Sequence, residues 1–216
     1  QDSYLLTRNS PQYYAENFAS RELKDGKMHW LNFHSTDDRK SIEKLGENLQ
    51  IEKLTIEDLY RDFKRPKLEE YDGYIFFKIK SALPKDDTPE LEVEAISFIL
   101  GEGYLISFQE KSSDHFTDVR NRIEQKRGKI RMKGSDFLLF RLLEAITDNY
   151  FEVLDDIVAS IEILEADLIK RPGSSTLKRI EIEKRKLIEL RRIVFPLKEI
   201  TSQLEKMQSP ILKKVN

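Results

Sequence analysis

The chain has 216 residues, and its 37 lysines and arginines against 39 aspartates and glutamates give a formal net charge of −2. This balance provides no positive field to attract nucleic acid or an anionic membrane surface, so nucleic acid is not an expected partner. A hydrophobic share of 39% beside a charged share of 35% argues against disorder, and the absence of cysteine excludes disulfides, thiolate metal sites and thiol catalysis.

Short apolar runs alternate with amphipathic segments over the first two thirds of the chain, which is typical of an α+β fold. Residues 37–49 carry apolar side chains at helical spacing and predict a helix. Gly101-Glu102-Gly103 separates two strand-like runs and predicts a β-hairpin. The runs that predict strands are residues 4–6, 28–33, 74–80, 93–100 and 104–109, with a loop at 84–89. We therefore expect a mixed β-sheet sandwiched by helices.

The last third of the chain predicts a long antiparallel helical hairpin. Residues 136–170 contain neither proline nor glycine, and their apolar residues recur at steps of three and four, so one long helix is expected. Residues 171–175 break it, with Ser174 or Ser175 placed to cap a second helix. Pro196 falls inside the apolar stripe of that helix and should kink or split it, because proline lacks the amide hydrogen.

Two domains follow from these patterns. We expect an α/β/α domain over residues 1–133 and the helical hairpin over residues 134–216, with the boundary near residues 129–134. No stretch approaches the roughly twenty apolar residues that a membrane helix needs, and no signal peptide opens the chain. The chain begins at Gln1 and ends without a helix cap or stop signal, so we expect a soluble fragment of a longer protein.

No pattern predicts an enzyme, and we assign no catalytic or cofactor-binding residue. A nucleophile with a partnering base cannot be assembled, and the eight glycines form no phosphate-binding loop. His29 and His34 stand five residues apart near the end of a strand, so we interpret them as partly exposed sheet or loop residues. We place His115 near a helix cap and give it no metal role.

The carboxylates carry more information. Glu57 and Asp58 stand together between apolar residues, and oxygen ligands of this kind suit hard cations such as Mg²⁺. The alternative is that they complement a helix dipole or pair with Lys64 or Arg65. Glu144 lies in an apolar setting on the long helix, where spacing alone makes it a glutamate at the border of a stripe. The acids between residues 155 and 167 form a solvated face, with weak ion binding as the lesser option.

Several short segments, in one order over residues 51–208, resemble CorA-family magnesium transporters. The matching segments are Ile56-Glu57-Asp58-Leu59, Lys64-Arg65-Pro66-Lys67, Tyr71 through Lys80, Phe108-Gln109-Glu110-Lys111, Val119 through Gly128, Asp136-Phe137-Leu138-Leu139, Asp148-Asn149-Tyr150-Phe151, Lys186 through Arg192 and Phe195-Pro196-Leu197-Lys198-Glu199. The Gly-Met-Asn tripeptide that follows the family's first membrane helix is absent. The transported ion therefore stays open, because related zinc transporters share this architecture.

The resemblance implies a homopentamer at the cytoplasmic face of the cell (inner) membrane. Each subunit would contribute a cytoplasmic α/β domain, a helical hairpin and a stalk helix, and this chain would supply the first two. Mg²⁺ bound between identical subunits would favour the closed channel, with Asp58 as the main sensing residue, Glu57 beside it and Glu144 at a second site. The opposing stalk acid would lie beyond Asn216. The resemblance makes Mg²⁺ both regulator and cargo, with Co²⁺, Ni²⁺ and Zn²⁺ as alternatives, and implies membrane contact only through C-terminal segments outside this sequence.

Two competing interpretations stay open at this point. A zinc transporter domain would share the architecture, although a site rich in carboxylates and poor in histidine and cysteine argues against zinc. A soluble interaction module would present the helical hairpin to a partner and use the acids for solubility alone.

Overall fold

Five strands form one mixed sheet in the order β1-β5-β4-β3-β2. The computed structural model describes residues 28–83, 90–111, 115–170 and 174–212. β1 pairs with β5 in parallel, and the other neighbouring strands are antiparallel. The strands are β1 (His29–Phe33), β2 (Lys67–Tyr71), β3 (Tyr74–Leu83), β4 (Glu92–Gly101) and β5 (Tyr104–Gln109). The predicted hairpin joins β4 to β5, and the strand expected at residues 4–6 lies outside the described residues.

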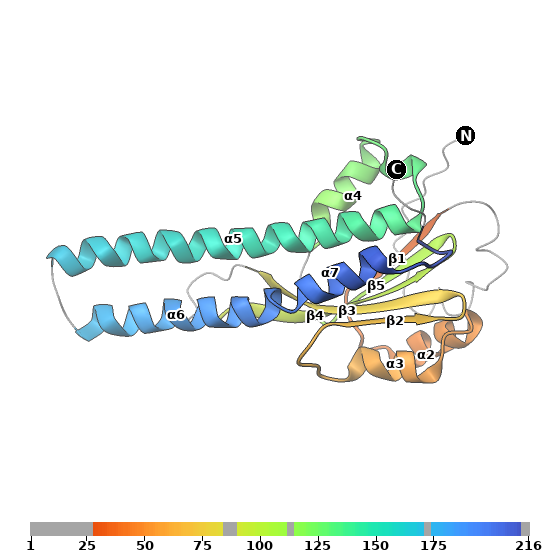
Figure 1. Ribbon diagram of the computed structural model, residues 1–216, viewed down its shortest axis with the longest axis horizontal. Coiled ribbons are helices and arrows are strands. Elements are labelled where there is room, and N and C mark those ends of the chain that lie inside the picture. Colours follow the sequence, from red (N-terminus) through yellow and green to blue (C-terminus); the bar gives the residue numbers. More distant parts are fainter. Residues whose placement is uncertain (1–27, 84–89, 112–114, 171–173, 213–216) are drawn as a thin grey trace.

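Helices cover both faces of the sheet, as Figure 1 shows. On one face lie α2 (Arg39–Asn48) and α3 (Lys53–Tyr60), and on the other lie α4 (Thr117–Glu124), α5 (Ser135–Lys170) and α7 (Leu197–Lys206). Alternate residues of each strand point to opposite faces, so the sheet separates two apolar cores. Phe76, Ile99 and Ile106 belong to the core under α2 and α3, while Ile75, Phe77 and Phe98 belong to the core under α5.

The hairpin consists of α5 and α6 (Ser174–Val194), which lie side by side and extend beyond the sheet (Figure 1). α5 has 36 residues and is therefore about 54 Å long at 1.5 Å per residue. Its first half packs on the sheet through Leu138, Leu142 and Ile146, so the hairpin shares a core with the strands. The predicted long helices are confirmed, and Pro196 splits the second one into α6 and α7.

The predicted division into domains falls close to a short 3-10 helix, η2 (Ile130–Met132), which immediately precedes α5. The division at residues 133 and 134 stays a prediction. α6 begins at Ser174, and the residues before it are not among those described, so the capping role of Ser174 or Ser175 also stays a prediction. The loop expected at 84–89 lies outside the described residues.

Candidate metal centre

Helix α3 presents the predicted carboxylates, and its apolar face fixes its position on the sheet. Ile56 and Leu59 are buried in the core beneath it. Thr55 is fully buried, and its hydroxyl lies 2.8 Å from that of Tyr74 on β3, which also accepts a hydrogen bond from the backbone N–H of Glu52. These contacts turn Glu57 and Asp58 away from the core, with side chains 43% and 15% exposed.

A buried lysine holds the C-terminal end of α3. The Lys78 ammonium, on β3, donates to the backbone carbonyls of Asp58 at 2.6 Å, Leu59 at 3.1 Å and Arg61 at 2.8 Å. These carbonyls have no partner within the helix and carry its partial negative charge, so a cation suits the position. Burial lowers the pKa of Lys78 below its ordinary value. Lys78 therefore fixes the backbone that carries Asp58.

Two basic side chains neutralise the carboxylates of α3. Arg61 pairs with Glu57 at 3.1 Å and more loosely with Asp58 at 3.5 Å. Lys67, on β2, pairs closely with Asp58 and lies 2.9 Å from the carboxylate of Glu69. Partial burial acts to lower the pKa of Lys67, but its hydrogen bonds with Asp58 and Glu69 outweigh that effect and raise it. A cation already sits where a metal ion would bind.

The pairing partners differ from those that the sequence suggested. The alternative interpretation of the two acids named Lys64 or Arg65 as partners, but Arg61 and Lys67 take that role. Arg61 is the C-cap residue of α3, four positions after Glu57, and Lys67 comes from the edge strand β2. The i, i+4 spacing of Glu57 and Arg61 was a signal in the sequence, whereas the Lys67 contact depends on the fold.

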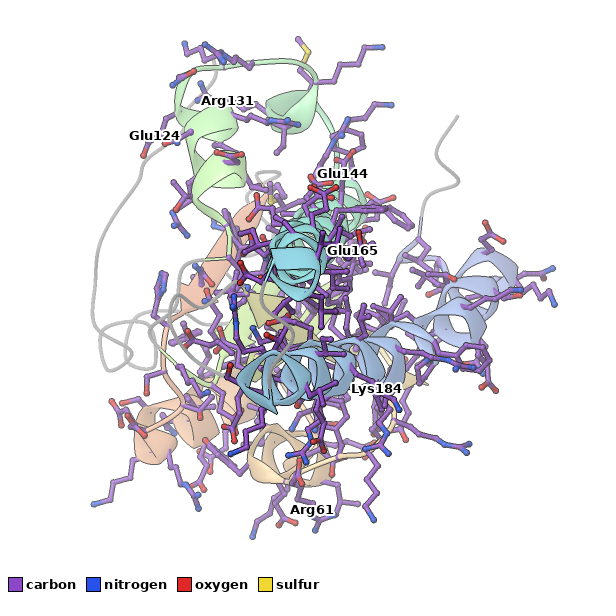
Figure 2. All side chains as sticks on the ribbon, turned by 90° about the vertical axis from the view of Figure 1, so that its left-hand side faces the viewer. Arg61, Glu124, Arg131, Glu144, Glu165 and Lys184 are labelled. Carbon is purple, nitrogen blue, oxygen red and sulfur yellow. The ribbon has the colours of Figure 1, made fainter. Side chains whose placement is uncertain are left out.

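Glu144 lies far from these acids in the fold. It stands on α5, 52% exposed, and pairs with Arg141 at 2.5 Å. It lines a cleft of about 580 Å³ between α4, η2 and α5. Because α3 and α5 cover opposite faces of the sheet, one chain cannot bring Glu144 and Asp58 to the same ion. In Figure 2, Glu144 lies in the upper half of the molecule, whereas Arg61, the ion-pair partner of Asp58, lies at its lower edge.

No cluster of three or more histidine, aspartate or glutamate side chains able to hold a metal ion occurs among the residues that the structure describes. The acids of the solvated face behave as expected: Asp155, Asp156, Glu162 and Glu165 are exposed, and Asp167 pairs with Arg179 at 3.0 Å. The structure therefore brings Glu57 and Asp58 together, but supplies too few ligands from one chain for a closed metal site.

A second polar cluster escaped the sequence analysis because its members are far apart in the chain. The His115 ring pairs through Nε2 with Glu94 on β4, and its Nδ1 lies 3.1 Å from both the Ser81 hydroxyl on β3 and the Asn149 amide on α5. Both members of the pair are almost fully buried. His115 is just before α4, as predicted, while His29 is half-buried in β1 and His34 is exposed. This cluster joins two strands to the long helix and has a structural role.

Comparisons with known proteins agree with this geometry. A family model described as CorA-like Mg²⁺ transporter protein matches residues 25–214. The chain is 37% identical over 188 residues to the cobalt/magnesium transport protein CorA of Thermotoga maritima, which covers 86% of this chain and 53% of that protein. The chain thus spans about half the length of that curated relative.

Solved structures share the fold. The soluble domain of CorA from Methanocaldococcus jannaschii superposes with a TM-score of 0.70 at 18% identity, over 86% of this chain and 73% of that one. The cytoplasmic domain of ZntB from Vibrio parahaemolyticus gives a TM-score of 0.67 at 18% identity, over 87% and 75%. Such identities show the fold alone.

A mixed sheet with a long helical hairpin is the fold that this chain shares with the soluble domain of CorA. The chain belongs to the CorA family, because the family model covers most of its length. Among the helices in the described ranges, none is long and apolar enough to cross a membrane.

Proposed function

We propose that this chain is the cytoplasmic divalent-cation-sensing domain of a Mg²⁺ channel. In this proposal identical subunits form a pentamer at the cytoplasmic face of the cell membrane, and Mg²⁺ bound between them through Asp58, Glu57 and Glu144 closes the pore. The domain is a regulator without catalytic activity. The family membership and the transporter relatives support this assignment.

The separation of the acids is the observation that carries the proposal. Asp58 and Glu57 lie on one face of the subunit, and Glu144 lies on the opposite face. A cyclic ring uses two different faces of each subunit, so neighbouring subunits can combine groups that one subunit keeps apart. A divalent ion at such a joint turns repulsion between carboxylates into attraction, and its occupancy can then shift the equilibrium between subunit arrangements.

The basic partners of Asp58 set the strength of this signal. A divalent ion must displace Lys67 and Arg61 from the carboxylates before it can bind them. Competition of this kind weakens binding, which suits a sensor that has to release Mg²⁺ when the cellular concentration falls. We expect half-saturation on the order of a millimolar, as for other weak oxygen-ligand sites.

Substitution of Asp58 tests the proposal. Mg²⁺ should raise the Tm of this chain or promote its self-association in analytical ultracentrifugation, because an ion that binds only the folded or assembled state stabilises it. Asp58→Asn should remove most of this response. Glu47→Gln, which removes an exposed acid paired with Lys44 on α2, should leave it unchanged.

Two further measurements separate the proposal from its competitors. A larger shift with Zn²⁺ than with Mg²⁺ would favour a zinc transporter domain, although oxygen ligands favour Mg²⁺. The reading frame beyond Asn216 should encode hydrophobic membrane spans. Equal responses of Asp58→Asn and the unsubstituted chain, or a downstream sequence that stays polar, would contradict the proposal.

A further inference from the structure

A basic cleft lies beside the connection between α3 and β2, and neither the paired acids of α3 nor Glu144 line it. It has a volume of about 780 Å³, within the range of roughly 300 to 1,000 Å³ that is usual for small-molecule sites. The connection between α3 and β2 forms one wall, and the C-terminal part of α6 forms the other. Figure 1 shows this connection reaching from α3 toward α6.

The cleft carries a strong local charge although the whole chain is close to neutral. Five basic side chains and one carboxylate, that of Glu189, line it. The basic residues come from three separate parts of the fold: Lys64 and Arg65 from the α3–β2 connection, Lys80 from β3, and Arg185 and Arg192 from α6. Cationic groups converge here from different elements, which concentrates a positive field in one cavity.

Few of these charges are neutralised. Arg185 pairs with Glu181 at 2.6 Å and Lys80 with Asp62 at 3.6 Å, but the carboxylates of those pairs are 61% and 91% exposed. Exposed ion pairs are weak, so an anion in the cleft can displace them. For Arg65 and Arg192, no ion pair occurs within the described part of the chain. The guanidinium groups of Arg65, Arg185 and Arg192 are therefore available to bind an anion, one from the α3–β2 connection and two from α6.

The chemistry of the lining points to one class of ligand. Guanidinium groups bind phosphate with two parallel hydrogen bonds, and several of them in one cavity suit an anion with more than one phosphate group. The same cavity has apolar surface from Phe63, Pro66 and Ile188, which a free inorganic anion would leave unused. We propose that this cleft binds an organic polyphosphate, of which a nucleoside triphosphate is the type, through Arg65, Arg185 and Arg192.

The position of the cleft gives such a ligand a structural consequence. The α3–β2 connection runs from Arg61, which pairs with the carboxylates of α3, to Lys67, which neutralises Asp58. A polyphosphate bound to Arg65 would hold this connection against α6. The site differs in sign and location from the proposed cation centre, so either proposal can fail without the other.

Binding of ATP to this chain, measured calorimetrically without added Mg²⁺, tests the assignment. We expect ATP to bind, inorganic triphosphate to bind more weakly, and adenosine to give no signal, since the phosphates supply most of the attraction. The double substitution Arg65→Gln, Arg192→Gln should weaken ATP binding at least about tenfold, because each removes a charge-assisted contact and keeps part of the side-chain stem. Added salt should weaken it further.

The matched control is Lys178→Gln, Lys184→Gln, which makes the same change in net charge on exposed positions of α6 outside the cleft. It should bind ATP as the unsubstituted chain does. Three results would overturn the proposal: no ATP binding, equal loss in the control, or binding of an acidic peptide or of phosphatidylglycerol vesicles in place of ATP. Unchanged circular dichroism of the cleft variant would show that any loss comes from the site and not from unfolding.

Discussion

Lys67 occupies the position beside Asp58 that a metal ion would take in the proposed site. Its ammonium contacts the carboxylates of Asp58 and Glu69, and these contacts raise its pKa despite partial burial. An internal cation of this kind keeps the acids neutralised when no metal is bound, and it competes with any metal that arrives. The residue therefore tunes the affinity of the proposed site without being one of its ligands.

Substitution of Lys67 by methionine should strengthen the response to Mg²⁺. Without metal, the Tm should fall, because the ammonium no longer separates two carboxylates. The Mg²⁺ concentration at half-response should fall roughly fivefold, the factor that corresponds to loss of a competing ion pair worth about 1 kcal/mol. A thermal-shift titration measures both quantities. Lys44→Met, which breaks an exposed pair with Glu47, is the control, and an unchanged half-response in Lys67→Met would exclude the competition.

Helix α3 depends on a strand that lies behind it. The carbonyl groups at the end of the helix have no hydrogen-bond donor within it. The Lys78 ammonium on β3 donates to three of them from the sheet beneath. This contact could not be predicted from the sequence, because it joins Lys78 to residues 17 to 20 positions earlier in the chain. A charge that is 2% exposed has to be compensated by good hydrogen bonds, and here three carbonyl groups compensate it.

Replacing Lys78 with methionine should destabilise the fold. Three carbonyl groups, one of them buried, would lose their donor, at a cost of about 1–3 kcal/mol in the free energy of unfolding. Urea unfolding measures this difference. Lys80→Met is a matched control on the same face of the same strand, because the Lys80 side chain is 34% exposed and its pair with Asp62 is long at 3.6 Å. Equal losses in both variants would mean that the carbonyl contacts contribute little.

The other elements differ in how far the sequence could reveal them. Periodicity predicted α5 and the split at Pro196, because long apolar stripes and a proline have direct local causes. β2 was not predicted, because three of its five residues are charged. Charged residues are common in edge strands, where they discourage pairing with another chain. The Asp72-Gly73 turn after it, with Gly73 at a φ of +84°, was the missed hairpin signal. Glu57 and Asp58 were found as a pair, but their basic partners depend on contacts between elements.

At the scale of the whole molecule, the sheet divides two faces with different chemistry. One face presents the acids of α3 with their basic partners. The other face presents α5, with Glu144 lining the cleft between α4, η2 and α5. The hairpin that extends beyond the sheet exposes large apolar side chains, among them Phe151 at 59%, Ile163 at 56% and Leu177 at 64%. Apolar surface of this kind is usual where proteins meet, which agrees with the proposed ring of subunits.

The stability of the whole fold should fall at alkaline pH. Burial raises the pKa of Tyr104 to about 12, raises that of Tyr60 to about 12 and also raises that of Tyr150. A folded-state pKa above the unfolded value of 10.0 means that the neutral hydroxyl stabilises the fold fully below pH 10.0, and that this contribution is lost as the pH rises toward 12. For Tyr104, which is 7% exposed, a rise of this size corresponds to a stabilisation on the order of a few kcal/mol.

Lys78 acts in the opposite sense, because its lowered pKa favours the fold as the pH rises toward its unfolded value of 10.5. Raised pKa values outnumber this one lowered value, since five tyrosines and Lys67 have them, so the free energy of unfolding should decline between about pH 10 and about pH 12. Urea unfolding at a series of pH values measures the decline. Tyr104→Phe removes one ionisable hydroxyl and should make the decline shallower. A free energy of unfolding that stays level over this range would show that the tyrosine hydroxyls ionise without disturbing either core.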